Sequence, residues 1–218
     1  GLEVGSLEDW EARAERMVLS QIEARGIRDE NILEAFRNVP RHLFVPEGLR
    51  KWAYDDNPLP LGNGQTISQP YMVALMTSRL DVVAGMKVLE VGTGSGYQAA
   101  ILARMGAEVY SIERIASLAR SASLLLKELG YPVKVRHGDG RLGLPEEAPF
   151  DRITVTAVAP SVPSALMEQC ALDARLVIPL GFPDGTERLL TRIKKGERFK
   201  DEWGEYCRFV SLLEGTVE

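Results

Sequence analysis

Short apolar segments alternate with helical segments between residues 83 and 181. Five segments have the length and apolar character of buried strands, and the stretches between them carry apolar residues at helical spacing. Such alternation predicts a doubly wound, mostly parallel Rossmann-like α/β sheet with helices on both faces, because parallel strands need helical crossovers. The five expected strands are residues 87–91, 108–112, 133–135, 153–156 and 176–180.

The segments on either side of this core follow other patterns. The pattern of the first 56 residues predicts three helices. The first is capped by Ser6 and ends at Gly26, the second is capped by Asp29, and a short third begins at Pro46. At the other end, residues 189–193 and 207–213 are strand-like and flank the polar segment 194–203, which indicates an antiparallel finish.

We therefore expect one domain over residues 1–218, since the length is about one and a half times that of a typical domain. Its expected parts are a helical extension (1–56), a segment that closes over the site (57–82), a cofactor-binding core (83–181) and antiparallel C-terminal strands (182–218).

Composition narrows the function classes. The chain has 26 Lys and Arg against 31 Asp and Glu, a net charge of −5, which argues against a nucleic-acid or anionic-membrane coat. No apolar run is long enough for a membrane helix, and no secretory signal is visible, so we expect a cytoplasmic protein. Cys170 and Cys207 lie far apart with no histidine-rich neighbourhood, so we expect neither a disulfide nor a metal site.

One stretch of 22 residues, 57–78, contains no charged side chain. Residues 58–68 are rich in Pro, Gly, Asn and Gln, and their composition predicts a loop. Pro70 opens a helix with a buried apolar face. The loop is either a ligand contact, through its hydroxyl and amide groups, or a well-packed connection.

A glycine-rich turn follows the first expected strand, where open α/β sheets bind ligands. Its glycines are Gly92, Gly94 and Gly96, whereas Tyr97 stands where the dinucleotide fingerprint GxGxxG has its third glycine. The shorter spacing, with Glu90 just before it, resembles motif I of the S-adenosylmethionine-dependent methyltransferases. Tight packing would be the other reason for such glycines.

Two more acidic residues follow successive strands. Glu113 is placed to accept hydrogen bonds from ribose hydroxyls, and Asp139, before Gly140, to accept one from an adenine amine. Alternatively, Glu113 pairs with Arg114 or faces a helix N-terminus, and Asp139 is only a turn residue. Three acidic residues around one glycine loop favour the ligand-binding interpretation.

Longer motifs resemble the protein-L-isoaspartate O-methyltransferases. They are the segment from Gly64 to Ala74 (GQTISQPYMVA), the segment from Val88 to Tyr97 (VLEVGTGSGY), Gly138-Asp139-Gly140 and Ala148-Pro149-Phe150-Asp151. The similarity runs from about residue 31 to residue 181. The resemblance implies that the protein methylates the α-carboxylate of L-isoaspartyl residues in damaged proteins. The resulting methyl ester then collapses to a succinimide that can reopen as aspartate.

The resemblance also implies a site and its partners. It makes Ser68 the catalytic residue and S-adenosyl-L-methionine the cofactor, with isoaspartyl proteins and peptides as partners. We expect a monomer without metal, nucleic acid or membrane. The implied cofactor-binding residues are Gln65, Thr66, Ile67, Ser68, Glu90, Gly92, Gly94, Gly96, Glu113, Asp139 and Gly140.

Two departures from the family pattern are visible. Asp173-Ala174 stands before Arg175 where relatives usually carry Gly-Gly, and Ser211 stands where they often carry proline. Ser211 lies in a region that the family uses near the substrate backbone, so peptide preference is the property it affects.

The expected chemistry needs no general base, because a carboxylate is already ionised at neutral pH. It needs in-line positioning and exclusion of water, so we interpret Ser68 as an orienting group and not as a nucleophile. Neither His42 nor His137 is required as a base.

Two other functions remain open on the sequence alone. One is a methyltransferase for a small molecule or RNA, although the acidic charge opposes RNA. The other is a non-catalytic adenosine- or NAD-binding module, although the glycine spacing opposes NAD.

Overall fold

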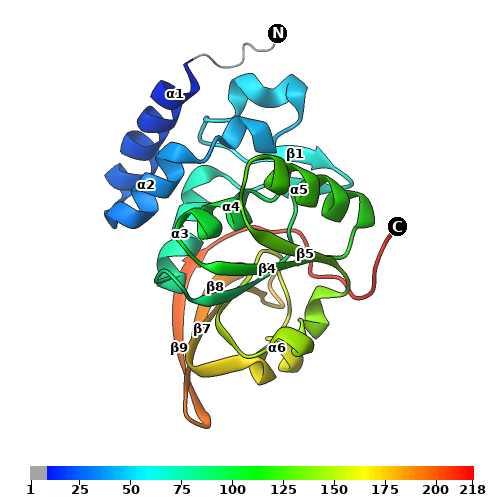
Figure 1. Cartoon of the computed structure of the whole chain (residues 1–218). Coiled ribbons are helices and arrows are strands. Elements are labelled where there is room, and N and C mark those ends of the chain that lie inside the picture. Colours follow the sequence, from blue (N-terminus) through cyan, green and yellow to red (C-terminus); the bar gives the residue numbers. More distant parts are fainter. Residues whose placement is uncertain (1–8) are drawn as a thin grey trace.

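A seven-stranded sheet forms the centre of the computed structural model, which describes residues 9–218 (Figure 1). The strand order is β5-β4-β3-β6-β7-β8-β9; the first five strands in this order are parallel, and β8 and β9 are antiparallel to their neighbours. The predicted mostly parallel α/β sheet is confirmed. Its strands are β3 (Lys87–Val91), β4 (Glu108–Glu113), β5 (Val133–His137), β6 (Phe150–Val155), β7 (Cys170–Gly181), β8 (Glu187–Lys195) and β9 (Arg198–Tyr206).

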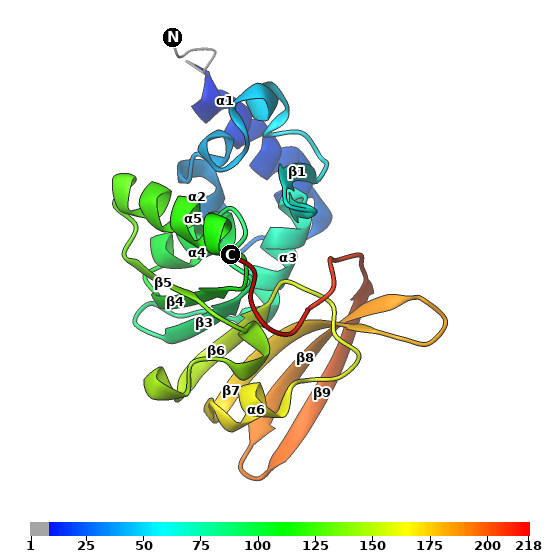
Figure 2. The ribbon, with the colours of Figure 1, turned by 90° about the vertical axis from the view of Figure 1, so that its right-hand side faces the viewer.

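Alternate residues of the central strands enter two separate cores. Val88 and Val109 pack with the helices of one face, whereas Leu89 and Tyr110 pack on the other. Figure 2 shows α3, α4 and α5 on the first face and α6 on the second. Helices on both faces are confirmed, although α6 is short and 3-10 turns connect β5 to β6. These helices are α3 (Pro70–Leu80), α4 (Tyr97–Arg104), α5 (Ala116–Glu128) and α6 (Ser164–Glu168).

The described part of the N-terminal extension, residues 9–56, is helical, as predicted. It contains α1 (Trp10–Met17), a continuation to Arg25, α2 (Glu30–Asn38) and 3-10 turns at Arg41–Phe44 and Glu47–Trp52. Gly26, at φ +99°, ends the first helix in the left-handed conformation that favours glycine. The predicted cap Ser6 lies outside the described residues.

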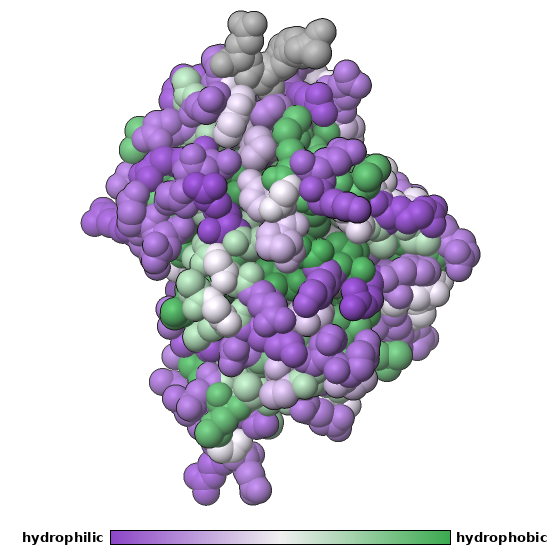
Figure 3. All heavy atoms as spheres, in the orientation of Figure 1, coloured by the Kyte–Doolittle hydropathy of each residue, from purple (hydrophilic) through white to green (hydrophobic). Residues whose placement is uncertain are grey.

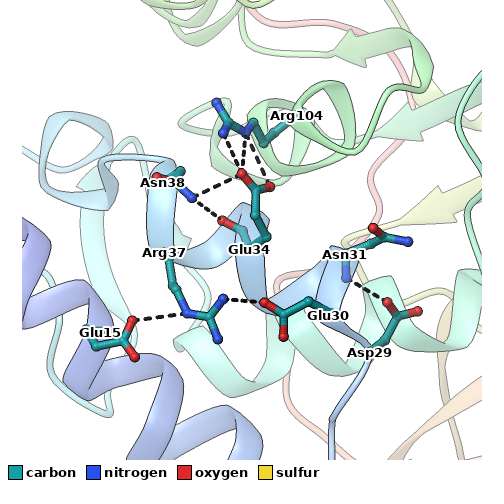
Figure 4. Close-up of polar contacts among 8 residues, drawn as sticks. All are labelled: Glu15, Asp29, Glu30, Asn31, Glu34, Arg37, Asn38 and Arg104. Atoms are coloured by element: carbon teal, nitrogen blue, oxygen red, sulfur yellow. Dashed lines mark hydrogen bonds and ion pairs between the residues drawn. The ribbon is translucent and has the colours of Figure 1, made fainter.

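One of the ion pairs in Figure 4 attaches the extension to the core, and the others join helices within the extension. Glu34 of α2 accepts from Arg104 of α4, and Arg37 bridges Glu15 of α1 and Glu30 of α2. All these groups are partly exposed, so each pair contributes little. The attachment therefore depends mainly on the apolar residues that the extension shares with the first core.

The predicted loop 58–68 is a β-hairpin, so that prediction is wrong. β1 (Leu59–Gly62) pairs antiparallel with β2 (Gln65–Ile67), and Asn63 and Gly64 make the turn at φ +55° and +70°. An Asn-Gly pair is a strong signal for a turn of this kind. Pro58 and Pro60 favoured a loop in the sequence-based prediction, although an edge strand tolerates proline.

The second C-terminal strand is also not where the sequence placed it. β9 covers residues 198–206, most of the expected polar connection, and a two-residue turn with Gly196 at φ +64° joins it to β8. Residues 207–213 leave the sheet and cross its carboxyl edge. Val158 holds them there by donating to Val210 O and accepting from Leu212 N, both at 2.8 Å.

No helix among residues 9–218 is long and apolar enough to cross a membrane.

The departure from the family pattern at Asp173 has a local explanation in the backbone. This residue takes φ +64° within β7, a conformation that glycine adopts freely and aspartate tolerates better than most residues. The backbone conformation of β7 at this position therefore accounts for the departure from the family pattern.

Asp29→Ala should lower the free energy of unfolding by about 1 kcal/mol, because Asp29 accepts from the Asn31 backbone N–H at 2.9 Å and caps α2. Urea unfolding measures this change. Asp9→Ala is the matched control, since Asp9 precedes α1 without a side-chain cap bond. Equal losses in both variants would contradict the capping role.

Candidate active site

A cavity opens at the carboxyl ends of β3, β4 and β6, where the strand order reverses between β3 and its two neighbours. Its empty space amounts to about 1040 Å3 when the part open to solvent is included. The hairpin, α3, the glycine loop and the C-terminal segment 208–213 all contribute to its walls. Of the predicted site residues, the cavity is lined by Gln65, Thr66, Ile67, Ser68, Glu90, Gly92, Gly94, Glu113 and Gly140.

The glycine loop owes its composition to backbone shape and close packing. Gly92, Gly94 and Gly96 have φ of +99°, +54° and +92°. A Cβ on Gly92 would lie 2.6 Å from Thr156 Oγ1. Gly96 does not line the cavity, and a Cβ there would press on Leu126 of α5. The first two glycines therefore shape the cavity, whereas Gly96 packs the loop against a helix.

Glu113 ends β4 with its side chain buried beside the loop. Its carboxylate accepts from the backbone N–H groups of Gly94, at 2.9 Å, and Ile115, at 3.0 Å. Among the described residues it forms no ion pair with Arg114, which was one alternative from the sequence. Each oxygen accepts one hydrogen bond and keeps acceptor capacity for a ligand.

Glu90 is fully buried at the end of β3. Ser111 donates to its Oε1 at 2.5 Å, and Thr93 lies 2.6 Å from the Ser111 hydroxyl. Burial raises the pKa of Glu90 to about 8; Ser111 opposes this shift and Glu113 adds to it. Oε2 has no hydrogen-bond partner among the described residues, which is costly for a buried oxygen unless a ligand supplies one.

Asp139 and Gly140 occupy different positions relative to the cavity. Gly140 lines it, and a Cβ there would lie 2.5 Å from Val91 Cγ1. Asp139 is not among the lining residues: its carboxylate accepts from the backbone N–H groups of Arg141, at 3.0 Å, and Gly215, at 2.8 Å, and from the Arg141 guanidinium. In this structure Asp139 thus caps a turn and holds the C-terminal segment.

Ser68 lies between β2 and α3 and lines the cavity, half-buried. No other described residue hydrogen-bonds its hydroxyl. It does not cap α3, because Gln69 occupies the N-cap position and no side chain makes a cap bond there. The hydroxyl is therefore available to a ligand and has no capping role in α3.

Sequence reasoning missed two parts of the lining. Residues 208–213 were expected to form a strand, yet they run along the cavity. Thr156 follows β6 and donates to Gly92 O at 2.8 Å. The end of the fourth expected strand was a signal for Thr156, since parallel strands end at one edge. The family resemblance placed Ser211 near the substrate, but no local pattern in residues 208–213 predicts that this segment leaves the sheet.

Both histidines lie outside the cavity lining. His42 is buried with Nδ1 2.9 Å from the Tyr54 hydroxyl, and burial, with Arg50 and Arg13 nearby, lowers its pKa to about 4. His137 Nε2 lies 3.0 Å from Arg114 O. Residues 9–218 contain no group of three or more His, Cys, Asp or Glu arranged as metal ligands.

Comparison with known proteins points to one family. The family model of protein-L-isoaspartate(D-aspartate) O-methyltransferase matches residues 12–217. The protein-L-isoaspartate O-methyltransferase of Syntrophus aciditrophicus is 53% identical over 202 residues, 91% of this chain and 92% of that protein. Protein-L-isoaspartate O-methyltransferase 2 of Pelobacter propionicus is 50% identical over 212 residues, 95% of this chain and 93% of that protein.

A solved structure agrees in fold. A Plasmodium falciparum protein named as a beta-aspartate methyltransferase (PCMT), in complex with S-adenosyl-L-homocysteine, superposes with a TM-score of 0.80 at 26% identity. The match covers 94% of this chain and 98% of that one. With a family model that spans nearly the whole chain and relatives identical at half of the aligned positions, this chain belongs to the protein-L-isoaspartate(D-aspartate) O-methyltransferase family.

Proposed function

We propose that the cavity binds S-adenosyl-L-methionine on the glycine-loop side and the α-carboxylate of an L-isoaspartyl residue beside Ser68. The observation that carries this assignment is that the acidic side chains of the cavity lie on one side of it. Glu90 and Glu113, with Arg114 beside Glu113, line the side formed by β3 and β4. Residues 65–68 present only amide, hydroxyl and apolar groups, and Arg208 lines the cavity from the C-terminal segment. The acidic side suits a cationic cofactor, and a side without carboxylates suits an anionic substrate.

The residues present fit this cofactor. When bound, it supplies a methyl group on a positively charged sulfur. Glu90 offers a buried Oε2 without a partner, and Glu113 offers two oxygens for the ribose hydroxyls. The positive-φ glycines let the backbone approach a ligand closely.

Asp139 and Gly140 are assigned to the adenine. Gly140 supplies backbone surface at the cavity wall. Oδ1 of Asp139 accepts one hydrogen bond, from Arg141 N, and keeps a second acceptor site for an amine that reaches past Gly140.

On the substrate side, the work of the protein is positioning. The substrate carboxylate is already ionised at neutral pH, so attack on the methyl group requires no proton transfer. Ser68 donates a hydrogen bond that orients the carboxylate, and the hairpin excludes water. A charged Asp or Glu at residues 65–68 would repel this substrate, and none is present. The ester formed then collapses to a succinimide, which reopens as aspartate or isoaspartate.

The partners of this reaction are isoaspartyl proteins and peptides, with no nucleic acid or membrane. We assign the protein to the cytoplasm. We also propose that it is a monomer with one domain over residues 1–218. The net charge of −5 supports the exclusion of nucleic acid. On the one face drawn in Figure 3, polar residues interrupt the apolar patches. Size-exclusion chromatography with light scattering tests the oligomeric state.

Ser68→Ala should lower kcat for an isoaspartyl peptide by about ten- to a thousandfold and leave S-adenosylhomocysteine affinity nearly unchanged, because one positioning hydrogen bond is lost. Steady-state kinetics and calorimetry measure the two effects. Ser78→Ala is the matched control, since Ser78 is half-buried at the far end of α3. A fully active Ser68→Ala protein would remove Ser68 from the catalytic role.

Glu113→Ala should weaken S-adenosylhomocysteine binding by about 10- to 150-fold, since a charge-assisted hydrogen bond contributes about 1.5–3 kcal/mol. Calorimetry on the folded variant measures the loss. Glu108→Ala, at the exposed start of the same strand, should bind normally. An unchanged affinity in Glu113→Ala would show that this carboxylate only supports the loop.

The raised pKa of Glu90 predicts a pH-dependent stability. Between about pH 5 and 8 the unfolded chain releases this proton while the folded protein keeps it. The free energy of unfolding should therefore fall as pH rises through this window, by at most about 1.4 kcal/mol per pH unit from this group. Urea unfolding of ligand-free protein measures the slope, and Glu90→Gln should reduce it. Equal slopes in both proteins would refute the assignment.

A further inference from the structure

A fully buried arginine lies at the base of the β1–β2 hairpin. Arg41 comes from the N-terminal extension and has 0% exposure. No carboxylate of the described residues forms an ion pair with it. A buried cation without a counter-charge is costly, so its retention requires a reason.

The guanidinium joins the two chain segments that flank the hairpin. Nε donates to Ala53 O at 2.6 Å, and Nη2 donates to Ser68 O at 2.9 Å. One planar, rigid group thus links Ala53, which precedes β1 by six positions, to Ser68, which directly follows β2. Because the Ser68 hydroxyl has no partner among the described residues, its place in the cavity depends on this backbone contact.

Arg41 also contacts Tyr97, which lines the cavity beside the glycine loop. Its guanidinium carbon lies 4.9 Å from the ring centre of Tyr97, a buried residue that lines the cavity and begins α4 after Gly96. Nη1 has no hydrogen-bond partner among the described residues. Two carbonyls and one ring therefore hold the charge in place without neutralising it.

The residue after Ser68 is held separately. Gln69 Nε2 donates to Asp56 Oδ1 at 2.8 Å, and Arg25 pairs with the same carboxylate. This second contact is solvent-exposed, whereas the Arg41 contacts are buried. Exposed ion pairs contribute little rigidity, so the buried contacts are the ones that fix Ser68.

We propose that Arg41 is a positioning residue for methyl transfer: by holding the Ser68 carbonyl and the Tyr97 ring, it fixes the Ser68 hydroxyl against the cofactor-binding wall. This inference rests on the proposed orienting role of Ser68. Lysine cannot replace arginine here, because an ammonium on a flexible stem lacks the planar fork that spans both carbonyls.

The test compares Arg41→Lys and Arg41→Met with the same changes at Arg152. Arg152 is a matched control, since it is 8% exposed and, among the residues that the structure describes, donates only to the backbone carbonyls of Asp81 and Asp151, at the opposite edge of the sheet. All four variants should lower Tm. Only the Arg41 variants should lower kcat for an isoaspartyl peptide, by about 10- to 100-fold at a temperature where circular dichroism shows folded protein.

S-adenosylhomocysteine affinity provides a second readout. It should change by less than about threefold in Arg41→Lys, which shows an intact cavity. If Arg41→Met does not fold, Arg41→Lys decides the test. Normal kcat in Arg41→Lys, or an equal kcat loss in Arg152→Lys, would overturn the proposal.

A double-mutant cycle separates this proposal from the role of Ser68. If Arg41 acts through the Ser68 hydroxyl, adding Arg41→Lys to Ser68→Ala should cost less than threefold more in kcat. Full additivity would refute the coupling while leaving the role of Ser68 intact. A fully active Ser68→Ala protein would instead refute the proposed function of Ser68, whatever the Arg41 variants do.

Discussion

Parallel alignment of β3, β4 and β6 is the constraint on which the site depends. It brings three carboxyl ends to one edge of the sheet, so that Glu90, Glu113 and Thr156 surround one cavity although they are far apart in the chain. The apolar residues of these strands are buried on both faces, which fixes their register. The geometry of the functional edge thus follows from the packing of the two cores.

The other half of the site comes from outside the parallel core. The uncharged hairpin and the C-terminal segment cover the edge, and the N-terminal extension holds the base of the hairpin through Arg41. Under the proposed function, the acidic side faces the cationic cofactor, and the uncharged residues 65–68 face the substrate carboxylate without repelling it. The extension is therefore part of the functional architecture, because it supplies the buried contact behind Ser68.

The sequence predicted the central strands and the helices α3, α4 and α5, whose apolar periodicity is strong. It failed at the hairpin, where the prolines and glycines of residues 58–68 indicated a loop, although Asn63-Gly64 was a usable turn signal. It also failed at β9. There, alternating charged and aromatic residues suit a strand at the sheet edge but resemble a polar connection when read alone.

By itself the sequence determined the fold class, the glycine loop, the acidic residues at the strand ends and the family resemblance, because these depend on local periodicity and short motifs. Only the tertiary structure decided that Asp139 bonds to Gly215, that residues 208–213 line the cavity, and that Arg41 lies behind Ser68. The Arg41–Ser68 and Asp139–Gly215 contacts join residues 27 and 76 positions apart. Such pairings are set by how the elements pack, and no local pattern of residues encodes them.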